Sequence, residues 1–299
     1  MDLKQLEYFV NVVDLGGFSR AGRVLGIAQP AISRQIRSLE VELRQNLLLR
    51  NGRGAAPTEA GKRLLAHARG ILLQVERARA EVDEIRGAPV GRIVVGLPPT
   101  LARLLTAPVV REFRRCFPRA TLAIVEGLSA SIHEWLQVGR IDVGLIYNPA
   151  PSPAVDARPL LEEALCFVAR REKGARVGPM PLAELPRHPL IIPSRPNAIR
   201  TLVETRLAQL GQKPQIAMEI DAVSAILELV AEGHGFAVLS ARALGGAEVA
   251  RKLLARPIAK PRISSTLTIA VSAQRPSTPL QEATVGLVES IAKATIAGG

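Results

Sequence analysis

Residues 25–40, "LGIAQPAISRQIRSLE", combine a turn signal with an amphipathic helical pattern. Pro30 suits the first helical position, where its fixed φ is favourable and its missing N–H costs nothing. Three apolar residues at helical spacing, Ile32, Ile36 and Leu39, predict a stripe that faces a core. The outward face carries Gln29, Pro30, Ser33, Arg34 and Arg37. Such a face belongs either to an ordinary solvated helix or to a helix that reads a ligand.

The residues upstream have the spacing of a helix-turn-helix. A small residue at Gly22 is followed at four residues by Gly26 and then by the apolar Ile27, with Ile32 five residues further on. Gly22 is small because two helices cross there, and Gly26 permits a left-handed turn. Ile27 and Ile32 then hold the second helix against the first. Glycine at position 22 costs its helix up to about 1 kcal/mol relative to alanine.

The next segment, "LLLRNGRGAAPTEAGKRLL" at 47–65, predicts a short β-wing followed by a new helix at Thr58. Its basic, glycine-rich tip carries Arg50 and Arg53. The helix-turn-helix spacing, the Pro30 start and the arginine-bearing wing occur together, and this combination favours DNA binding over a merely solvated surface.

The overall composition is compatible with DNA binding but would not predict it by itself. The 299 residues suffice for about two domains, and 47% hydrophobic with 22% charged residues is typical of a soluble globular protein. The net charge is +12, but residues 1–58 hold eight Lys or Arg against five Asp or Glu, a net of only +3. Two cysteines, Cys116 and Cys166, indicate a reducing compartment. With no signal peptide and no membrane span in the pattern, we expect a cytoplasmic protein.

Residues 59–87 form a long helical pattern without proline. Apolar residues step along it by four and three, as in a coiled-coil heptad. These are Leu64, Ala68, Ile71, Val75, Ala78, Val82 and Ile85. The pattern predicts a dimer through residues 64–85, the alternative being a helix packed on its own domain. "GAPVG" at 87–91 would end the helix and act as a hinge.

Residues 88–299 alternate apolar strands with helices, which predicts a parallel sheet in an α/β region. Strands are expected at 92–97, 121–126 and 142–147, and the alternation recurs from "PLIIP" to "FAVLS" at 189–193 and 236–240. The strand "STLTIAVS" at 265–272 and a helix from Pro279 close the chain.

"FSRAGRVLGIAQPAISRQIRSLEVEL" (18–43) followed by "LLRNGRGAAPTEAG" (48–61) resembles the winged helix-turn-helix of LysR-type transcriptional regulators. The resemblance runs through the whole chain in order and length. It implies a mainly α winged helix-turn-helix over 1–58, a linker and dimerisation helix over 59–87, and an α/β effector domain over 88–299. That domain would be two-lobed and similar to periplasmic binding proteins. Lobe I would span about 92–163 and 268–299, and lobe II about 164–267.

The resemblance also assigns the contacts with DNA. Gln29, Pro30, Ser33 and Arg34 would meet the major groove, and the wing near Arg53 the backbone or minor groove. Side-chain geometry suits Arg34 to guanine and Gln29 to adenine. Ser33 is better suited to a phosphate contact, and Arg37, Arg50 and Arg53 are charge partners for the backbone. Two wing departures, Leu49 for the usual Phe and Ala56-Pro57 for an apolar-Leu pair, concern packing rather than base contact.

The resemblance further implies a homotetramer or dimer on an interrupted inverted repeat, contact with RNA polymerase, and a small-molecule co-inducer between the lobes. The candidate effector residues lie where strands end or helices begin. They are Thr100, Ser129, Tyr147, Ser194 and Asn197. Helix N-termini there favour an anionic ligand, although each polar residue alone is more simply a helix cap. Pro98-Pro99 departs from the usual small polar residues and removes two N–H donors. Two segments, "IPSRPNAIRTLVE" and "EIDAVSAILELV", resemble members of nitrogen-assimilation or aromatic-catabolism type.

Two other classes of protein are alternatives to a transcriptional regulator. An enzyme is disfavoured because the four histidines are scattered and no metal-binding spacing, nucleophile elbow or phosphate-binding loop is present. Cys116 has basic neighbours but is better explained as a structural thiol. We therefore expect no catalytic residue, no metal and no cofactor. A non-transcriptional DNA-binding protein is the second alternative, and it would show no ligand-dependent change in DNA binding.

Overall fold

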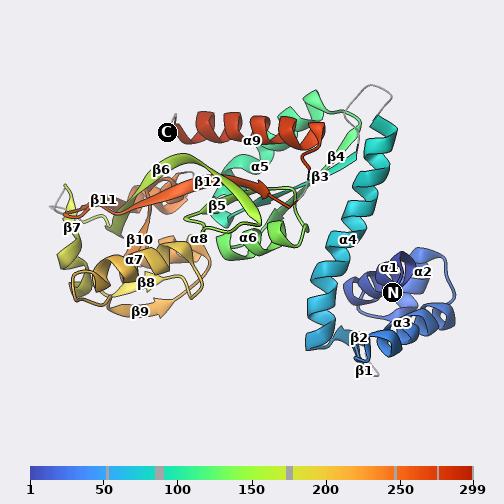
Figure 1. The fold of residues 1–299 in the computed structure, drawn as a ribbon. Coiled ribbons are helices and arrows are strands. Elements are labelled where there is room, and N and C mark those ends of the chain that lie inside the picture. Colours follow the sequence, from blue (N-terminus) through green and yellow to red (C-terminus); the bar gives the residue numbers. More distant parts are fainter. Residues whose placement is uncertain (52–53, 85–90, 173–177, 246–247, 275, 298–299) are drawn as a thin grey trace.

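The computed structural model describes residues 1–51, 54–84, 91–172, 178–245, 248–274 and 276–297. A small helical unit at the N-terminus is joined by the long helix α4 to a larger α/β region (Figure 1). This order of a winged helical unit, a linker helix and a two-lobed α/β region confirms the fold class expected from the sequence.

The N-terminal unit consists of three helices and a two-stranded wing. Its elements are α1 (Leu3–Asp14), α2 (Phe18–Leu25), α3 (Gln29–Leu43), β1 (Leu48–Asn51) and β2 (Gly54–Pro57). Asp2 caps α1 through a reciprocal capping box with Gln5. The apolar stripe of α3 is fully buried against α1 and α2, as the spacing of its residues predicted.

The turn between α2 and α3 has the geometry that the glycines indicated. Gly26 ends α2 in the left-handed region, with φ of 66°. At Gly22, an added Cβ would lie 2.7 Å from the carbonyl oxygen of Ile27, so the close approach there requires glycine. Helix α3 begins at Gln29, which places Pro30 at the second helical position rather than the first. The correction is small, because the second N–H of a helix also has no acceptor within the helix.

Helix α4 (Glu59–Glu84) begins after Thr58, whose hydroxyl accepts a hydrogen bond from the N–H of Gly61 at 3.0 Å. The residues of the expected dimer seam fall into two groups along α4, one buried within the chain and one exposed. Leu64 packs against the core of the N-terminal unit and Ala68 is fully buried, so this part of the seam is used within the chain. Ile71 is 37% exposed. Ile85 lies outside the described residues.

Lobe I is built on the parallel strands β3 (Gly91–Leu97), β4 (Ala120–Glu126) and β5 (Val143–Tyr147). One face of this sheet is covered by α5 (Pro99–Cys116) and α9 (Pro279–Ala297), and the other by α6 (Ser129–Gln137) (Figure 1). The expectation of a parallel sheet is incomplete. Two long strands, β6 (Val155–Arg170) and β12 (Ser264–Ser272), join it in antiparallel pairing and make the sheet mixed.

Strand β6 runs from lobe I into lobe II. It pairs with β12 up to Ala164 and then with β10 and β11 from Leu165 onward. The chain returns at Ile263, whose carbonyl accepts from the N–H of Leu165. The strand therefore leaves lobe I near Ala164 and the chain returns near Ile263, where the sequence led us to expect crossings near residues 163 and 267.

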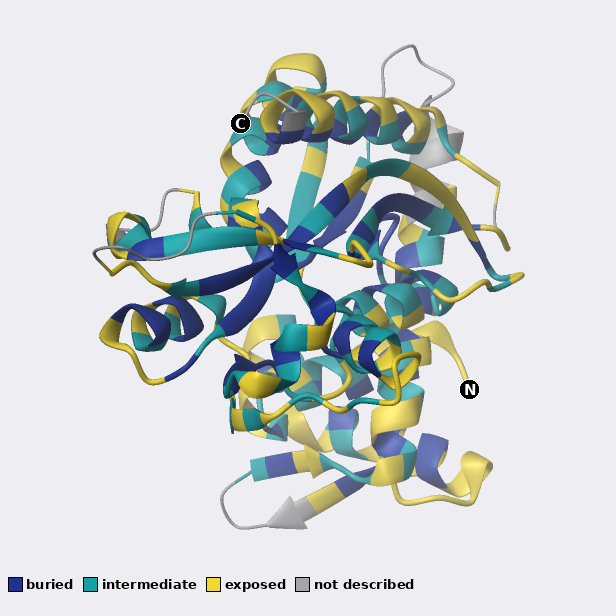
Figure 2. Ribbon diagram, turned by 90° about the vertical axis from the view of Figure 1, so that its left-hand side faces the viewer, coloured by how far each residue is buried: buried dark blue, intermediate teal, exposed yellow. Residues whose placement is uncertain are grey.

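Lobe II contains short strands and two helices. Its elements are β7 (Met180–Pro181), β8 (Leu190–Ile192), α7 (Ala198–Ala208), β9 (Ile216–Glu219), α8 (Val223–Glu232), β10 (Ala237–Ser240) and β11 (Leu253–Ala259). The buried residues gather on the strands and on the inward faces of the helices in each lobe, and exposed residues lie on the outer faces (Figure 2).

Candidate functional site

The outward face of α3, which we call the recognition face, comprises Gln29, Pro30, Ser33, Arg34 and Arg37. Four of these residues are exposed and Ser33 is half-buried. Ile32, Ile36 and Leu39 on the opposite side have no solvent exposure. The buried stripe fixes the rotation of the helix, so both arginine side chains start from its solvent-facing side. A helix presented in this way can enter the major groove of DNA.

A buried carboxylate, missed at the sequence level, ties α3 to the wing. Glu40 is 5% exposed, and its Oε1 accepts hydrogen bonds from the N–H groups of Leu47 (2.9 Å) and Leu48 (3.2 Å). These two residues open the wing. Glu40 therefore sets the position of the wing relative to the recognition face. Its place on the buried side of an amphipathic helix was the available signal.

The wing is a β-hairpin in which Arg50 pairs with Ala55. Leu48 and Ala55 are buried, whereas Leu49 is 59% exposed. Leu49 thus takes no part in the wing core. The Arg50 side chain and the whole of Arg53 lie outside the described residues, so their predicted DNA contacts stay predictions.

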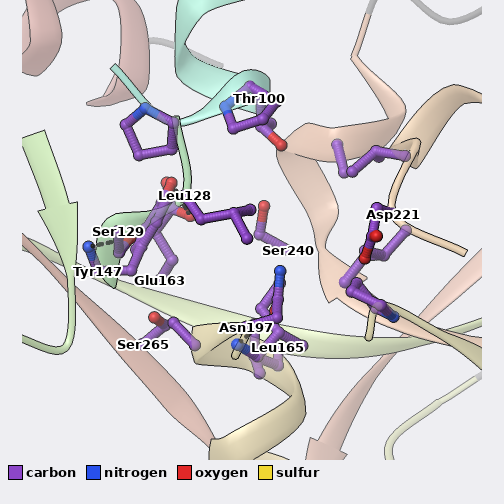
Figure 3. A pocket seen from close by; sticks show the side chains of 18 residues that line it. Thr100, Leu128, Ser129, Tyr147, Glu163, Leu165, Asn197, Asp221, Ser240 and Ser265 are labelled. Atoms are coloured by element: carbon purple, nitrogen blue, oxygen red, sulfur yellow. Dashed lines mark hydrogen bonds between the residues drawn. The ribbon is translucent and has the colours of Figure 1, made fainter. Parts of the chain in front are cut away.

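A pocket lies between the two lobes, where helix N-termini from both lobes meet (Figure 3). Residues at the start of α5 and α6 line it from lobe I, and residues at the start of α7 and α8 from lobe II. The space inside it is about 70 Å³, and it shares lining residues with two larger hollows of about 710 Å³ and 510 Å³. The space of about 70 Å³ has room for roughly five to seven water molecules, or for a small organic molecule.

Four of the five predicted effector residues line this pocket: Thr100, Ser129, Tyr147 and Asn197. Ser194 is not among the lining residues. Its N–H and hydroxyl both donate to the carboxylate of Asp221, at 2.9 Å and 2.6 Å, and Asp221 itself lines the pocket. These hydrogen bonds hold the pKa of Asp221 below its ordinary value.

Two of the predicted residues have structural partners as well. The Asn197 side chain caps α7 by accepting from the N–H groups of Ile199 and Arg200. The Ser129 hydroxyl oxygen accepts from the N–H of Tyr147 at 3.0 Å. Both side chains therefore shape the pocket whether or not a ligand is present.

Sequence reasoning missed a buried acid at the floor of the pocket. Glu163 is 4% exposed, accepts from the Tyr147 hydroxyl at 3.1 Å, and pairs with Arg242 at 2.6 Å. Burial raises the pKa of Tyr147 far above its ordinary value, and the Glu163 carboxylate raises it further. Tyr147 is therefore a neutral hydrogen-bond donor to Glu163. The three residues are distant in sequence, and no local pattern connects them.

Metal binding and membrane insertion can be addressed for the described part of the chain. There, no group of three or more His, Cys, Asp or Glu side chains is placed to hold a metal ion. Within the same residues, no helix is both long enough and apolar enough to cross a bilayer.

Two family models match nearly the whole chain. Residues 3–62 match the bacterial regulatory helix-turn-helix of the lysR family, and residues 86–292 match the LysR substrate binding domain. The first covers the three helices and the wing, and the second covers both lobes. The family is one of transcriptional regulators rather than of enzymes.

Individual relatives agree with these matches. The chain is 34% identical to the nitrogen assimilation regulatory protein nac of Klebsiella aerogenes over 296 residues, 97% of this chain and 95% of the relative. Among solved structures, full-length CbnR in complex with its target DNA has a TM-score of 0.71 at 24% identity, over 97% of this chain and all of that one. Full-length OxyR from Pseudomonas aeruginosa has a TM-score of 0.70 at 21% identity, over 97% of each chain. The fold, the recognition face and the full-length match to nac together place this chain in the LysR family of DNA-binding transcriptional regulators, with an effector-binding domain of the family's type.

Proposed function

We propose that the protein binds an interrupted inverted repeat as a homodimer or homotetramer, with one recognition face in the major groove of each half-site. In this role Arg34 reads guanine and Gln29 reads adenine. Arg37 and Ser33 contact phosphates and hold the helix in register. The exposure of Gln29, Arg34 and Arg37 opposite a fully buried stripe supports the assignment.

Self-association through α4 would bring two such units to one DNA site. The first part of the helix already packs on the N-terminal unit, so a partner would use the later part, where Ile71 and Ala78 are exposed. Two half-sites read by one rigid dimer need a fixed spacing on the DNA helix. Contact with RNA polymerase and a cytoplasmic location complete the proposal, on the basis of the family.

We further propose that a small-molecule effector in the interlobe pocket alters DNA binding, and α6 is the observation that carries this. Ser129 at its first turn lines the pocket. Leu136 near its other end belongs to the same buried cluster as Leu73 of α4, and the carbonyl of Val138 just beyond lies against Gly70. One short helix thus contacts both the pocket and the linker helix.

The linker helix continues this path to the DNA-binding unit. Arg69, next to Gly70, forms an ion pair with Asp14 at the end of α1. A ligand that shifts α6 would therefore change how α4 and the N-terminal unit are held relative to lobe I. Any such shift is limited by how differently the ligand binds the two arrangements.

The dimeric mode is tested by changing half-site spacing in a DNA site that the protein selects. Inserting about five base pairs between half-sites turns one of them to the opposite side of the helix, and about ten base pairs restores the phase. We expect binding of the full-length protein to fall sharply with the first insertion and to recover in part with the second. Equal binding to all three sites would exclude a rigid dimer reading two half-sites.

A further inference from the structure

We propose that the ligand of the interlobe pocket carries a positively charged, hydrogen-bond-donating group such as a primary amine, rather than the carboxylate expected from helix N-termini. The proposal rests on the effector function proposed above and names the chemistry that the pocket accepts. It follows from the charges, the backbone donors and one unpartnered hydroxyl in the lining.

The charged side chains that line the pocket are both acidic. They are Glu163 and Asp221, and no described lining residue is Lys, Arg or His. The charge of Glu163 is balanced by its ion pair with Arg242. Asp221 accepts only from the neutral Ser194 in the described structure, so its negative charge is not balanced by a bound cation. Asp221 is exposed to solvent, which screens its charge, but the charge still favours an ammonium group over a second anion.

The helix N-termini around the pocket offer fewer free donors than their number suggests. Helix α5 starts at Pro98-Pro99, two residues without an N–H. At α7 the Asn197 side chain already takes two N–H groups, and Asp221 places a carboxylate just before α8. Helices α6 and α8, among these four, keep their first-turn donors without a side-chain cap or a proline. Anion binding at helix ends needs such donors, and at α5 and α7 part of them are absent or used, while at α8 the Asp221 carboxylate stands next to them.

Ser240 supplies independent evidence for a ligand. Its side chain lines the pocket although the residue is only 8% exposed, and its hydroxyl has no hydrogen-bond partner among the described residues. Figure 3 shows this hydroxyl turned toward the interior of the group of lining side chains. The hydroxyl oxygen is not fully enclosed, so it can donate to or accept from a molecule in the pocket. A ligand with a polar head would satisfy Ser240 together with Asp221.

Most of the remaining lining residues are apolar, and they determine the non-polar part of the ligand. They include Pro98, Leu128, Leu165, Val223 and Leu239. The pocket therefore suits a short aliphatic body of about five heavy atoms with one polar end. Isobutylamine, isobutanol and isobutyrate have this size and differ in the charge of the polar end.

The test is saturation-transfer NMR on the full-length protein with these three probes at millimolar concentration. We expect isobutylamine to bind and isobutyrate not to bind. Asp221→Asn keeps an oxygen for Ser194 but removes the charge, and it should weaken amine binding by roughly 10- to 100-fold. Glu232→Gln removes the same charge at an exposed position at the end of α8 and should leave amine binding unchanged. Ser240→Ala should weaken amine binding without affecting the fold.

The outcomes separate this inference from the function on which it rests. Isobutyrate or isobutanol binding that is lost in Ser240→Ala, without amine binding, would overturn the charged-ligand class while keeping an effector pocket. Amine binding that survives Asp221→Asn would overturn the assignment of Asp221. Binding of none of the three probes would overturn both the ligand class and the effector pocket, and would leave DNA binding untouched.

Discussion

Replacing Glu40 by alanine tests how the wing is held against the recognition helix. The change leaves the N–H groups of Leu47 and Leu48 without the acceptor that now lies at 2.9 Å and 3.2 Å. Each buried donor left unsatisfied costs about 1–3 kcal/mol, so the expected loss of local stability is roughly 2–6 kcal/mol. Glu40→Gln keeps an acceptor oxygen and should lose only part of this amount.

Hydrogen exchange measured by mass spectrometry on the full-length protein reports this loss where it occurs. A cost of at least about 2 kcal/mol corresponds to roughly 30-fold faster exchange for a peptide that covers residues 44–50. We expect Glu40→Ala to reach or exceed this acceleration, Glu40→Gln to fall between it and the unmodified protein, and peptides from lobe II to be unchanged. Unchanged exchange in Glu40→Ala, or equal effects of the two substitutions, would refute the assigned role of the carboxylate.

Three further predictions concern base reading by Arg34, the contact between α4 and the end of α6, and the pH dependence of stability. Arg34→Ala should lose roughly 1–3 kcal/mol of discrimination between a selected site and random DNA, measured by competition binding; equal losses on both would refute base reading. Gly70→Ala adds a methyl group that meets a backbone oxygen beyond α6, so it should lower unfolding stability by about 1–3 kcal/mol and alter DNA affinity. Its control is Gly286→Ala, where an added methyl meets nothing within 4 Å and stability should hold or rise in thermal unfolding. Burial raises the pKa of Glu204, but hydrogen bonds from arginines, chiefly the buried Arg200, outweigh it and lower the pKa below its ordinary 4.5. The stability from this ion pair is therefore full above pH 4.5 and lost as pH falls below it, and urea unfolding of Glu204→Gln should show a weaker decline.

Much of the fold could be predicted from local periodicity and turn chemistry. The register of α3 and the left-handed Gly26 depend on residues a few positions apart, and the structure has both. The strand β6 was not foreseen, because its 16 residues alternate poorly and cross between two environments. The antiparallel pairing of β12 with β6 depends on that strand and could not be inferred without it.

The residues of the candidate site also divide into those that local sequence patterns predict and those that only the folded chain brings together. Ser129 and Asn197 were found because they stand at helix starts, which a sequence pattern reveals. Glu163 and Arg242 lie 79 residues apart and meet only after the lobes have formed. Ser194 was expected to face the ligand, but the fold brings Asp221 close enough to engage it. Charge in the pocket is thus a property of tertiary contacts, which local patterns do not encode.

The central claim is that this chain reads specific DNA through the recognition face. Capturing genomic fragments on the purified protein at two salt concentrations, and sequencing what is retained, tests it most directly. The account predicts a few intergenic sites that share an imperfect inverted repeat and persist at the higher salt, because base contacts add to the salt-sensitive phosphate contacts. Retention of unrelated fragments that disappear at the higher salt would contradict it and leave only charge-driven binding.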